Sequence, residues 1–314
     1  MSVTRRIGEA TDHAERRLEA AVARVPDWQG RNVRYTALVG GLSNQNWLVE
    51  VEGHDRRYFL KVPGEGTELF VDRLATNEAA RNSYNLGLAP EVIFFDPSDG
   101  LEVSEFMEGY RACTTTDFMD PAIQDEVISI YRQFHAGPRL GLTKTIFDMI
   151  EEHWTQGQEL GALFPPDMPW LRHRYKQAKD AFHAAGLDLV PCFNDPMPGN
   201  FLISPNKPMR LIDYEFSSTN ERAYDLGVLF AEMFYDEQRT TELIEIYFGH
   251  VTQSAISRVI LNRALADLKW ASWAVVNRKL NSWDFDYQKY GVWKYMRARS
   301  VMFDERWEYW LRKI

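Results

Sequence analysis

The stretch CFNDPMPGNF, residues 192–201, holds an acid and an amide at a fixed spacing inside a run of turn-forming residues. Asp195 precedes Asn200 by five positions, and two prolines and a glycine between them restrict the backbone. A carboxylate held in this way can accept the proton of an attacking hydroxyl, and an amide oxygen is a hard ligand for Mg²⁺. Asp213 closes the next strand-like run, MRLID, and offers a second hard oxygen. The spacing therefore predicts phosphoryl-transfer chemistry, with Asp195 as the base and with Asn200 and Asp213 as magnesium ligands.

The same residues also fit an ordinary turn followed by a hairpin whose acids are solvated. The pattern D-x4-N alone does not separate the two interpretations. Asp213 at the end of the hairpin favours the functional one, because a short strand pair would bring it beside Asn200.

The N-terminal third carries residues that could hold phosphates. In LVGGLSNQNWLVEV, a Gly-Gly turn separates two strand-like runs, and Ser43 and Asn44 can direct hydroxyl, amide and backbone N–H groups at phosphate oxygens. Lys61 ends the run YFLKV, where its charge could hold the α- and β-phosphates, and Glu78 on the following helix could orient it. Each feature alone is common in surface hairpins and surface ion pairs. Their order along the chain, ahead of D-x4-N and a strand-ending acid, favours a nucleotide site.

Hydrophobic periodicity predicts the elements that must position these residues. Alternation with a period of two predicts strands over about 33–41, 47–53, 56–62, 91–96 and 101–106. Helical spacing predicts helices over 6–24 and about 72–86. Helical patterns dominate from about residue 121 to the end, where FLIS and MRLID form the only clear strand pair. We therefore predict a sheet-rich part of the chain followed by a larger helical part.

Composition excludes several classes of protein. The 314-residue chain is 45% hydrophobic, which is ample for a large core, and its net charge of −9 disfavours nucleic acid as a partner. Only two cysteines occur, Cys113 and Cys192, so we expect no disulfide framework and a reducing compartment. The charged N-terminus and the lack of an apolar run of about 20 residues predict no signal peptide, no membrane insertion and a cytoplasmic location.

The order of these motifs resembles the protein-kinase-like fold in its small-molecule branch, specifically the choline/ethanolamine kinase family related to aminoglycoside phosphotransferases. The segments GGLSN (40–44), CFNDPMPGNFL (192–202) and LIDYEFSSTNERAYDLG (211–227) carry the resemblance, which extends from about Val33 to Tyr295. It implies the roles already given for Asp195, Asn200 and Asp213, and it implies that Lys61 and Glu78 form an ion pair that orients phosphates. It also implies a hinge at EFMEG (105–109), where the backbone at Glu105 and Met107 would hydrogen-bond adenine.

Two positions near the catalytic motif call for separate interpretation. The family usually has His where this chain has Phe193, and the change removes a hydrogen-bond donor worth about 1 kcal/mol. We expect a weakened or altered loop, not an inactive enzyme. His135, in QFHAG, ends a predicted helix and is interpreted as structural.

Aromatic residues near the C-terminus suggest a site for a cation. Trp270 and Trp273 are three apart on a predicted helix, and Tyr287 and Tyr290 repeat that spacing. A quaternary ammonium donates no hydrogen bonds and is held by ring faces, although aromatic pairs at this spacing are more often core residues.

The family resemblance favours the binding role. It implies that these four residues, together with Phe285, line an acceptor pocket, that Glu232 faces the ammonium and that Phe216 stands where relatives have Tyr. Tyr235 is a further candidate that could equally pack between helices.

These observations predict an α+β, bilobal protein-kinase-like chain: an antiparallel-sheet nucleotide-binding lobe over 1–104, a hinge at 105–109 and a mainly helical lobe over 110–314. We expect an ATP- and Mg²⁺-dependent phosphotransferase that phosphorylates the hydroxyl of choline. The alternatives are a kinase for ethanolamine, another amino alcohol or an aminoglycoside, and a non-catalytic module that binds choline or nucleotide. The oligomeric state stays open, with a homodimer as one option.

Overall fold

The computed structural model describes residues 3–40, 44–280 and 285–314, and the chain divides into two compact units. Unit 1 comprises Met1–Arg111 and Leu202–Glu215, and unit 2 comprises Ala112–Phe201 and Phe216–Ile314. The segment 202–215, expected in the helical part, therefore belongs to the sheet-rich unit. The hinge over 105–109 stays a prediction.

Unit 1 is built on a six-stranded antiparallel sheet in the order β1-β2-β3-β4-β6-β5. Its strands are β1 (Thr4–Arg6), β2 (Val33–Ala37), β3 (Asn44–Val51), β4 (Tyr58–Pro63), β5 (Val92–Asp96) and β6 (Leu101–Glu105). Five of these strands were predicted, and β1 was not. The register places Lys61 of β4 between Asn46 of β3 and Glu102 of β6, near the middle of the sheet.

Two helices and two short 3-10 turns complete the main part of unit 1: α1 (His13–Val22), η1 (Pro26–Trp28), η2 (Thr67–Leu69) and α2 (Arg73–Asn85). The predicted helix over 6–24 begins later than expected, because residues 4–6 add an edge strand and Gly8 turns the chain with φ +92°. The Asp12 side chain then caps α1 by accepting from the Glu15 N–H. Asp72 caps α2 in the same way, which fits the predicted start of that helix.

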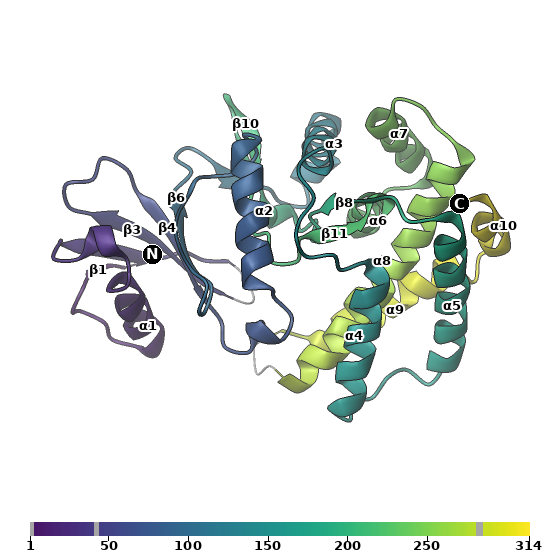
Figure 1. Cartoon of the computed structure of the whole chain (residues 1–314), viewed down its shortest axis with the longest axis horizontal. Coiled ribbons are helices and arrows are strands. Elements are labelled where there is room, and N and C mark those ends of the chain that lie inside the picture. Colours follow the sequence, from purple (N-terminus) through teal and green to yellow (C-terminus); the bar gives the residue numbers. More distant parts are fainter. Residues whose placement is uncertain (1–2, 41–43, 281–284) are drawn as a thin grey trace. The chain divides into compact units, whose positions relative to one another are not determined.

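Unit 2 is mainly helical. Its helices are α3 (Pro121–His135), α4 (Ile146–Glu159), α5 (Met168–Ala185), α6 (Arg222–Glu232), α7 (Glu237–Phe248), α8 (Gln253–Leu280), α9 (Tyr287–Met302) and α10 (Trp307–Lys313), with a 3-10 turn η3 (Asp117–Met119). Helix α8 is buried along most of its length, because α4, α6 and α9 pack around it (Figure 1). Among the described helices, none combines the length and the apolar character that crossing a bilayer requires.

The crossing of α6 and α8 depends on a glycine. A Cβ atom added at Gly227 would lie 2.8 Å from the Asn262 Cβ and 2.9 Å from the Val259 carbonyl oxygen. Both distances are shorter than real Cβ contacts, so only glycine permits the two backbones to approach this closely.

Short strands flank the loop that carries Asp195. Strand β8 (Leu189–Cys192) pairs antiparallel with β11 (Ser218–Glu221) in unit 2, so the expectation of a single strand pair after residue 109 is wrong. Both strands lack a strand-like pattern, since β8 contains a proline and β11 is entirely polar. The predicted hairpin forms as β9 (Phe201–Ser204) and β10 (Lys207–Leu211), preceded by the 3-10 turn η4 (Pro198–Asn200). The short strand β7 (Arg111–Ala112) lies where the first segment of unit 1 ends.

Candidate active site

The loop between β8 and η4 brings Asp195 and Asn200 together in unit 2. The Asn200 Nδ2 lies 3.2 Å from the Asp195 carbonyl oxygen and 3.3 Å from its Oδ2. The preceding residue, Asn194, has φ +68°, a left-handed conformation that asparagine tolerates better than most residues. Its amide nitrogen donates to the Phe216 carbonyl (2.7 Å) and to the Ser218 Oγ (2.9 Å), which fixes the turn that aims Asp195.

A buried carboxylate anchors this loop, and the sequence analysis did not identify it. Asp225, on α6, accepts hydrogen bonds from the backbone N–H groups of Phe193 and Asn194, both at 2.6 Å. Its Oδ2 also lies 2.9 Å from the His135 Nε2, and the His135 Nδ1 lies 2.6 Å from the Tyr247 hydroxyl. Asp225 lies inside the motif AYDLG, so its place in that motif was the available signal.

The Asp225 anchor gives a testable prediction. In Asp225→Asn, one of the two oxygen acceptors becomes an amide NH₂ group that faces a backbone N–H, and a buried unsatisfied donor costs about 1–3 kcal/mol. We expect a lower melting temperature and a kcat reduced by about 10- to 100-fold, because the loop no longer holds Asp195 in place. Thermal denaturation and an ADP-release assay measure the two effects. A stable variant with wild-type kcat would contradict the anchoring role.

Phe193 occupies a fully apolar position. Its ring is completely buried and packs edge-on against Phe201, with ring centroids 6.3 Å apart. Phe201 in turn contacts Phe118 and Tyr131. The backbone of Phe193, not its side chain, makes the hydrogen bond to Asp225. The predicted weakening of the loop stays a prediction, but the main-chain contacts that hold the loop are in place.

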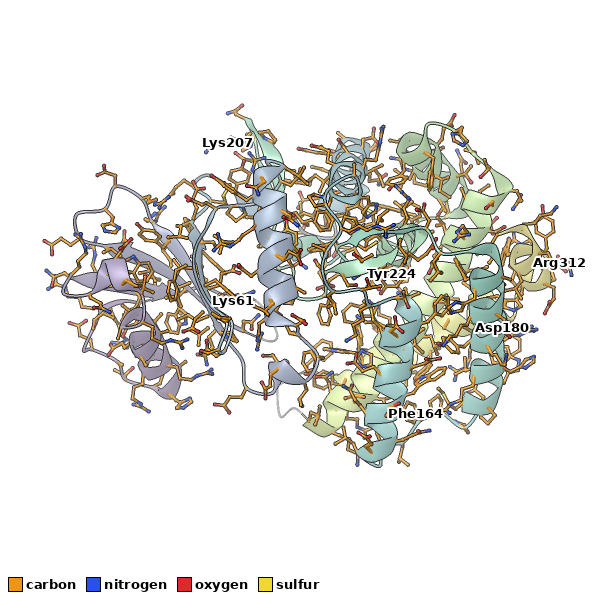
Figure 2. The ribbon with its side chains drawn as sticks, viewed as in Figure 1. Lys61, Phe164, Asp180, Lys207, Tyr224 and Arg312 are labelled. Carbon is orange, nitrogen blue, oxygen red and sulfur yellow. The ribbon has the colours of Figure 1, made fainter. Side chains whose placement is uncertain are left out.

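A second group of polar residues lies in unit 1 around Lys61, which is labelled in Figure 2. The Lys61 Nζ lies 3.4 Å from the Glu215 Oε1 and 3.8 Å from the Asp213 Oδ1, and only 7% of the residue is exposed. Burial lowers the pKa of Lys61, but the carboxylates of Glu215, Glu102 and Asp213 outweigh it and raise that pKa above its ordinary value. The amine is therefore charged at neutral pH. The Asn44 Nδ2 donates to the same Glu215 oxygen at 2.9 Å.

Glu215 is a second residue that sequence reasoning missed. The sequence predicted Glu78 as the partner of Lys61, and Glu78 lies on α2 in the same unit. That pairing stays a prediction, whereas Glu215 is a partner of Lys61 in the structure. The expected phosphate-binding Ser43 lies outside the described residues.

Two backbone donors in the segment 105–107 are already used, since the Phe106 N–H donates to the Arg57 carbonyl at 3.2 Å and the Glu105 N–H is also engaged. The Glu105 N–H donates to the Glu91 carbonyl at 2.9 Å, and the Met107 carbonyl accepts from the Tyr110 N–H at 3.2 Å. If this segment binds adenine, the Glu105 carbonyl and the Met107 N–H are the groups to expect in those contacts.

The six aromatic residues expected in the acceptor pocket form one connected cluster in unit 2. The cluster consists of Phe216, Trp270, Trp273, Phe285, Tyr287 and Tyr290. The Trp273 ring is central to it, with centroids 5.6 Å from Trp270, 5.6 Å from Tyr287 and 6.1 Å from Tyr290. Asp195 lies near enough for its charge to contribute, after burial and Glu232, to the raised pKa of Tyr290. The loop that carries Asp195 and the aromatic cluster are therefore neighbours within one unit.

Comparison with known proteins identifies the family to which the chain belongs. Residues 35–253 match the choline/ethanolamine kinase family. The chain belongs to that family. It is 26% identical to probable choline kinase 3 of Arabidopsis thaliana over 92% of this chain and 88% of the relative. A choline/ethanolamine kinase family protein from Mesorhizobium loti superposes with a TM-score of 0.80 at 23% identity, covering 96% of this chain and 99% of that one.

The fold is the protein-kinase-like α+β fold of this family and of the aminoglycoside phosphotransferases. An ADP-bound aminoglycoside phosphotransferase superposes with a TM-score of 0.59 at 14% identity, covering 90% of this chain and 98% of that one. Membership of the choline/ethanolamine kinase family identifies the chain as a kinase-type phosphotransferase that uses ATP and acts on a small molecule. The family description names both choline and ethanolamine and leaves the acceptor open.

Glu232, which was expected to face the substrate ammonium, lies between two basic residues of α9. Its carboxylate bonds to the Lys294 amine and lies 3.0 Å from the Arg297 Nη2. Burial raises the pKa of Glu232, but Lys294 and Arg297 outweigh it and lower that pKa. Arg297 also pairs with Asp267, so two acids and two bases balance one another here. The negative charge of Glu232 is therefore already compensated by Lys294 and Arg297. Its role towards a substrate ammonium stays a prediction.

Tyr235, the further candidate, serves in packing contacts. Its hydroxyl donates to the Phe118 carbonyl at 3.0 Å, and its ring lies 5.9 Å from that of Phe230.

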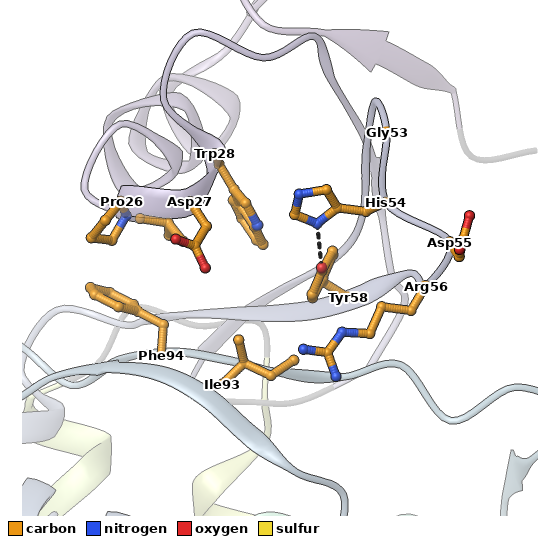
Figure 3. A pocket seen from close by; sticks show the side chains of 11 residues that line it. Pro26, Asp27, Trp28, Gly53, His54, Asp55, Arg56, Tyr58, Ile93 and Phe94 are labelled. Carbon is orange, nitrogen blue, oxygen red and sulfur yellow. Dashed lines mark hydrogen bonds between the residues drawn. The ribbon is translucent and has the colours of Figure 1, made fainter.

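Two cavities of the described residues do not coincide with these groups. A cavity of about 580 Å³ in unit 1 is lined by residues that include Trp28, His54, Tyr58 and Phe94 (Figure 3). The expected site residues that the structure describes do not line it. A cavity of about 560 Å³ in unit 2 touches the aromatic cluster only at Tyr287.

Proposed function

We propose that this kinase transfers the γ-phosphoryl group of ATP to the hydroxyl of choline. Asp195 accepts the hydroxyl proton, and the aromatic cluster around Trp273 holds the trimethylammonium group. The support comes from unit 2, where the acid, its amide neighbour Asn200 and the aromatic cluster belong to one compact body. An aromatic surface with a carboxylate nearby suits a cation that cannot donate hydrogen bonds.

The nucleotide contacts are proposed for residues of both units. Lys61, charged and held by Glu215, would bind phosphate oxygens, and the backbone at Glu105 and Met107 would bind adenine. The side-chain Nδ2 of Asn200 donates to Asp195, so the side-chain Oδ1 of Asn200 is the atom suited to a metal. The Asp213 carboxylate would supply a second oxygen ligand of the kind that Mg²⁺ prefers. Bound magnesium would neutralise charge on the phosphate oxygens. That Asp195, Asn200 and Asp213 act on one nucleotide stays a prediction.

An acceptor panel tests this proposal. ADP release is measured with ATP, Mg²⁺ and, separately, choline, ethanolamine, other amino alcohols and aminoglycosides. We expect the highest kcat/KM with choline. A higher value with ethanolamine or an aminoglycoside would reassign the acceptor. If no acceptor increases ADP release above the background, the proposed activity is wrong and a binding module becomes the better description.

Trp273→Ala should separate acceptor binding from nucleotide binding. Loss of a buried ring that contacts a cation costs about 2 kcal/mol, so we expect the KM for choline to rise by at least about 10-fold. The KM for ATP should change by less than about twofold, since the ring lies in the acceptor cluster. Steady-state kinetics measure both constants.

Trp293→Ala is the matched control, because Trp293 lies on α9 in the same unit and is 58% exposed. It should leave both constants unchanged. An equal rise in both constants in Trp273→Ala would show that Trp273 is only a core residue.

A further inference from the structure

A lysine lies within the aromatic cluster. Lys269 precedes Trp270 on α8, and only 1% of the residue is exposed. Its Nζ lies 3.0 Å from the centroid of the Trp270 ring and 4.4 Å from the centroid of the Phe216 ring. The amine therefore covers one face of Trp270, a residue that the proposed function assigns to the acceptor.

This amine has no internal hydrogen-bond partner within the described residues. Buried lysines are normally paired, since an unpaired amine in apolar surroundings loses its hydration without compensation. Burial lowers the pKa of Lys269 well below its ordinary value, and the negative charge of Asp195 opposes that effect. The other charged or titratable groups that act on it are Lys144, Glu152, His153 and Lys294.

The position of the amine limits what the cluster can bind. A trimethylammonium group binds an aromatic ring through its face, within about 6 Å of the centroid. The Lys269 Nζ already occupies that space on Trp270. It blocks the face sterically when neutral, and it also repels a second cation when protonated. In either state the quaternary group gains this face of Trp270 only if the lysine side chain moves away.

We propose that Lys269 is a specificity-determining residue that competes with a quaternary ammonium for the Trp270 face and so reduces this enzyme's preference for choline over primary amino alcohols. This inference rests on the proposed function, since it assumes that the cluster receives the acceptor's cationic head. A primary ammonium relies on hydrogen bonds to oxygen more than on ring faces, so the competition affects it less.

Lys269→Leu tests the competition directly. Leucine is too short to cover the ring and carries no amine. We expect the KM for choline to fall by at least about 10-fold, the scale of one desolvated cation–ring contact, and the KM for ethanolamine to change by less than about threefold. The dissociation constant of tetramethylammonium, measured by calorimetry on the full chain, should fall with the KM for choline. Since tetramethylammonium has no hydroxyl, this measurement does not depend on turnover.

Two further variants complete the design. Lys279→Leu removes a positive charge from the exposed end of the same helix. It should leave the KM for choline and the dissociation constant of tetramethylammonium unchanged. Lys269→Arg keeps a permanent cation at the ring and should not tighten tetramethylammonium binding. Melting temperatures identify any variant that fails to fold, in which case Lys269→Ala, which also removes the amine and leaves the ring face uncovered, replaces the leucine variant in the binding measurement.

The outcomes separate this inference from the proposed function. If folded Lys269→Leu binds choline and tetramethylammonium no better than the wild type, the competition does not exist. If it binds tetramethylammonium more tightly while no amino alcohol is phosphorylated by the wild type, the role of Lys269 stands and the proposed activity fails.

Discussion

Replacing Asp195 with asparagine should lower kcat for choline phosphorylation by about 10²- to 10⁴-fold, the range that a positioned general base contributes. Asparagine keeps the size of the side chain and its contact with Asn200, whose Nδ2 lies 3.3 Å from the Asp195 Oδ2, but it cannot accept the hydroxyl proton. The affinity for choline, measured by calorimetry without nucleotide, should change little, because ring faces hold the cation. Steady-state kinetics of ADP release measure kcat.

Asp180→Asn is the matched control. Asp180 is an acid in the same unit whose side chain is 63% exposed and pairs with Lys176, four residues earlier on α5. The control should keep wild-type kcat. Turnover within about threefold of the wild type in Asp195→Asn would exclude Asp195 as the base, since a loss that small lies below the range of general base catalysis.

The second large effect concerns Lys61. In Lys61→Met the buried Glu215 carboxylate, whose side chain is 5% exposed, loses its cation and keeps the Asn44 amide as a donor to its Oε1. An uncompensated buried charge of this kind costs about 3–5 kcal/mol, so unit 1 should become markedly less stable. Activity should also fall by about 10²- to 10³-fold, the loss seen when a group that stabilises transition-state charge is removed. Thermal denaturation and ADP release measure the two effects.

The double variant Lys61→Met/Glu215→Gln separates stability from catalysis. Glutamine can still accept from Asn44 but carries no charge, so most of the lost stability should return. Activity should stay low, because the cation that would bind phosphate is still missing. If the double variant regains activity along with stability, Lys61 only supports the fold.

Local patterns in the sequence predicted the framework well. The strands around Tyr35 and Val49 alternate between buried and less buried positions, and a side-chain cap at Asp72 precedes α2. These signals are local, because they depend on periodicity and on hydrogen bonds within a few residues. By contrast, β8 and β11 depend on each other for their backbone hydrogen bonds, and neither segment carries a pattern of its own.

The parts of the site that were missed share one physical cause. Glu215, Asp225 and Lys269 are charged residues that become buried through contacts with distant segments. Within its helix, Lys269 reads as an ordinary solvated lysine, and only the packing of α8 inside unit 2 places its amine on a ring. For the same reason the sequence did not show that Lys294 and Arg297 of α9 pair with Glu232. Partners contributed by other elements cannot be deduced from one segment.

The close crossing at Gly227 has a consequence for redesigning the acceptor preference. Helix α6 carries Asp225, which holds the loop of the proposed base Asp195, and α8 carries Trp270 and Trp273. A methyl group at position 227 would force α6 and α8 apart and would displace Asp225 and the two tryptophans together. A loss of activity in such a variant could not be assigned to either helix. Mutant libraries can therefore vary the ring-bearing end of α8, but they should keep position 227 and its neighbours on the facing helix constant.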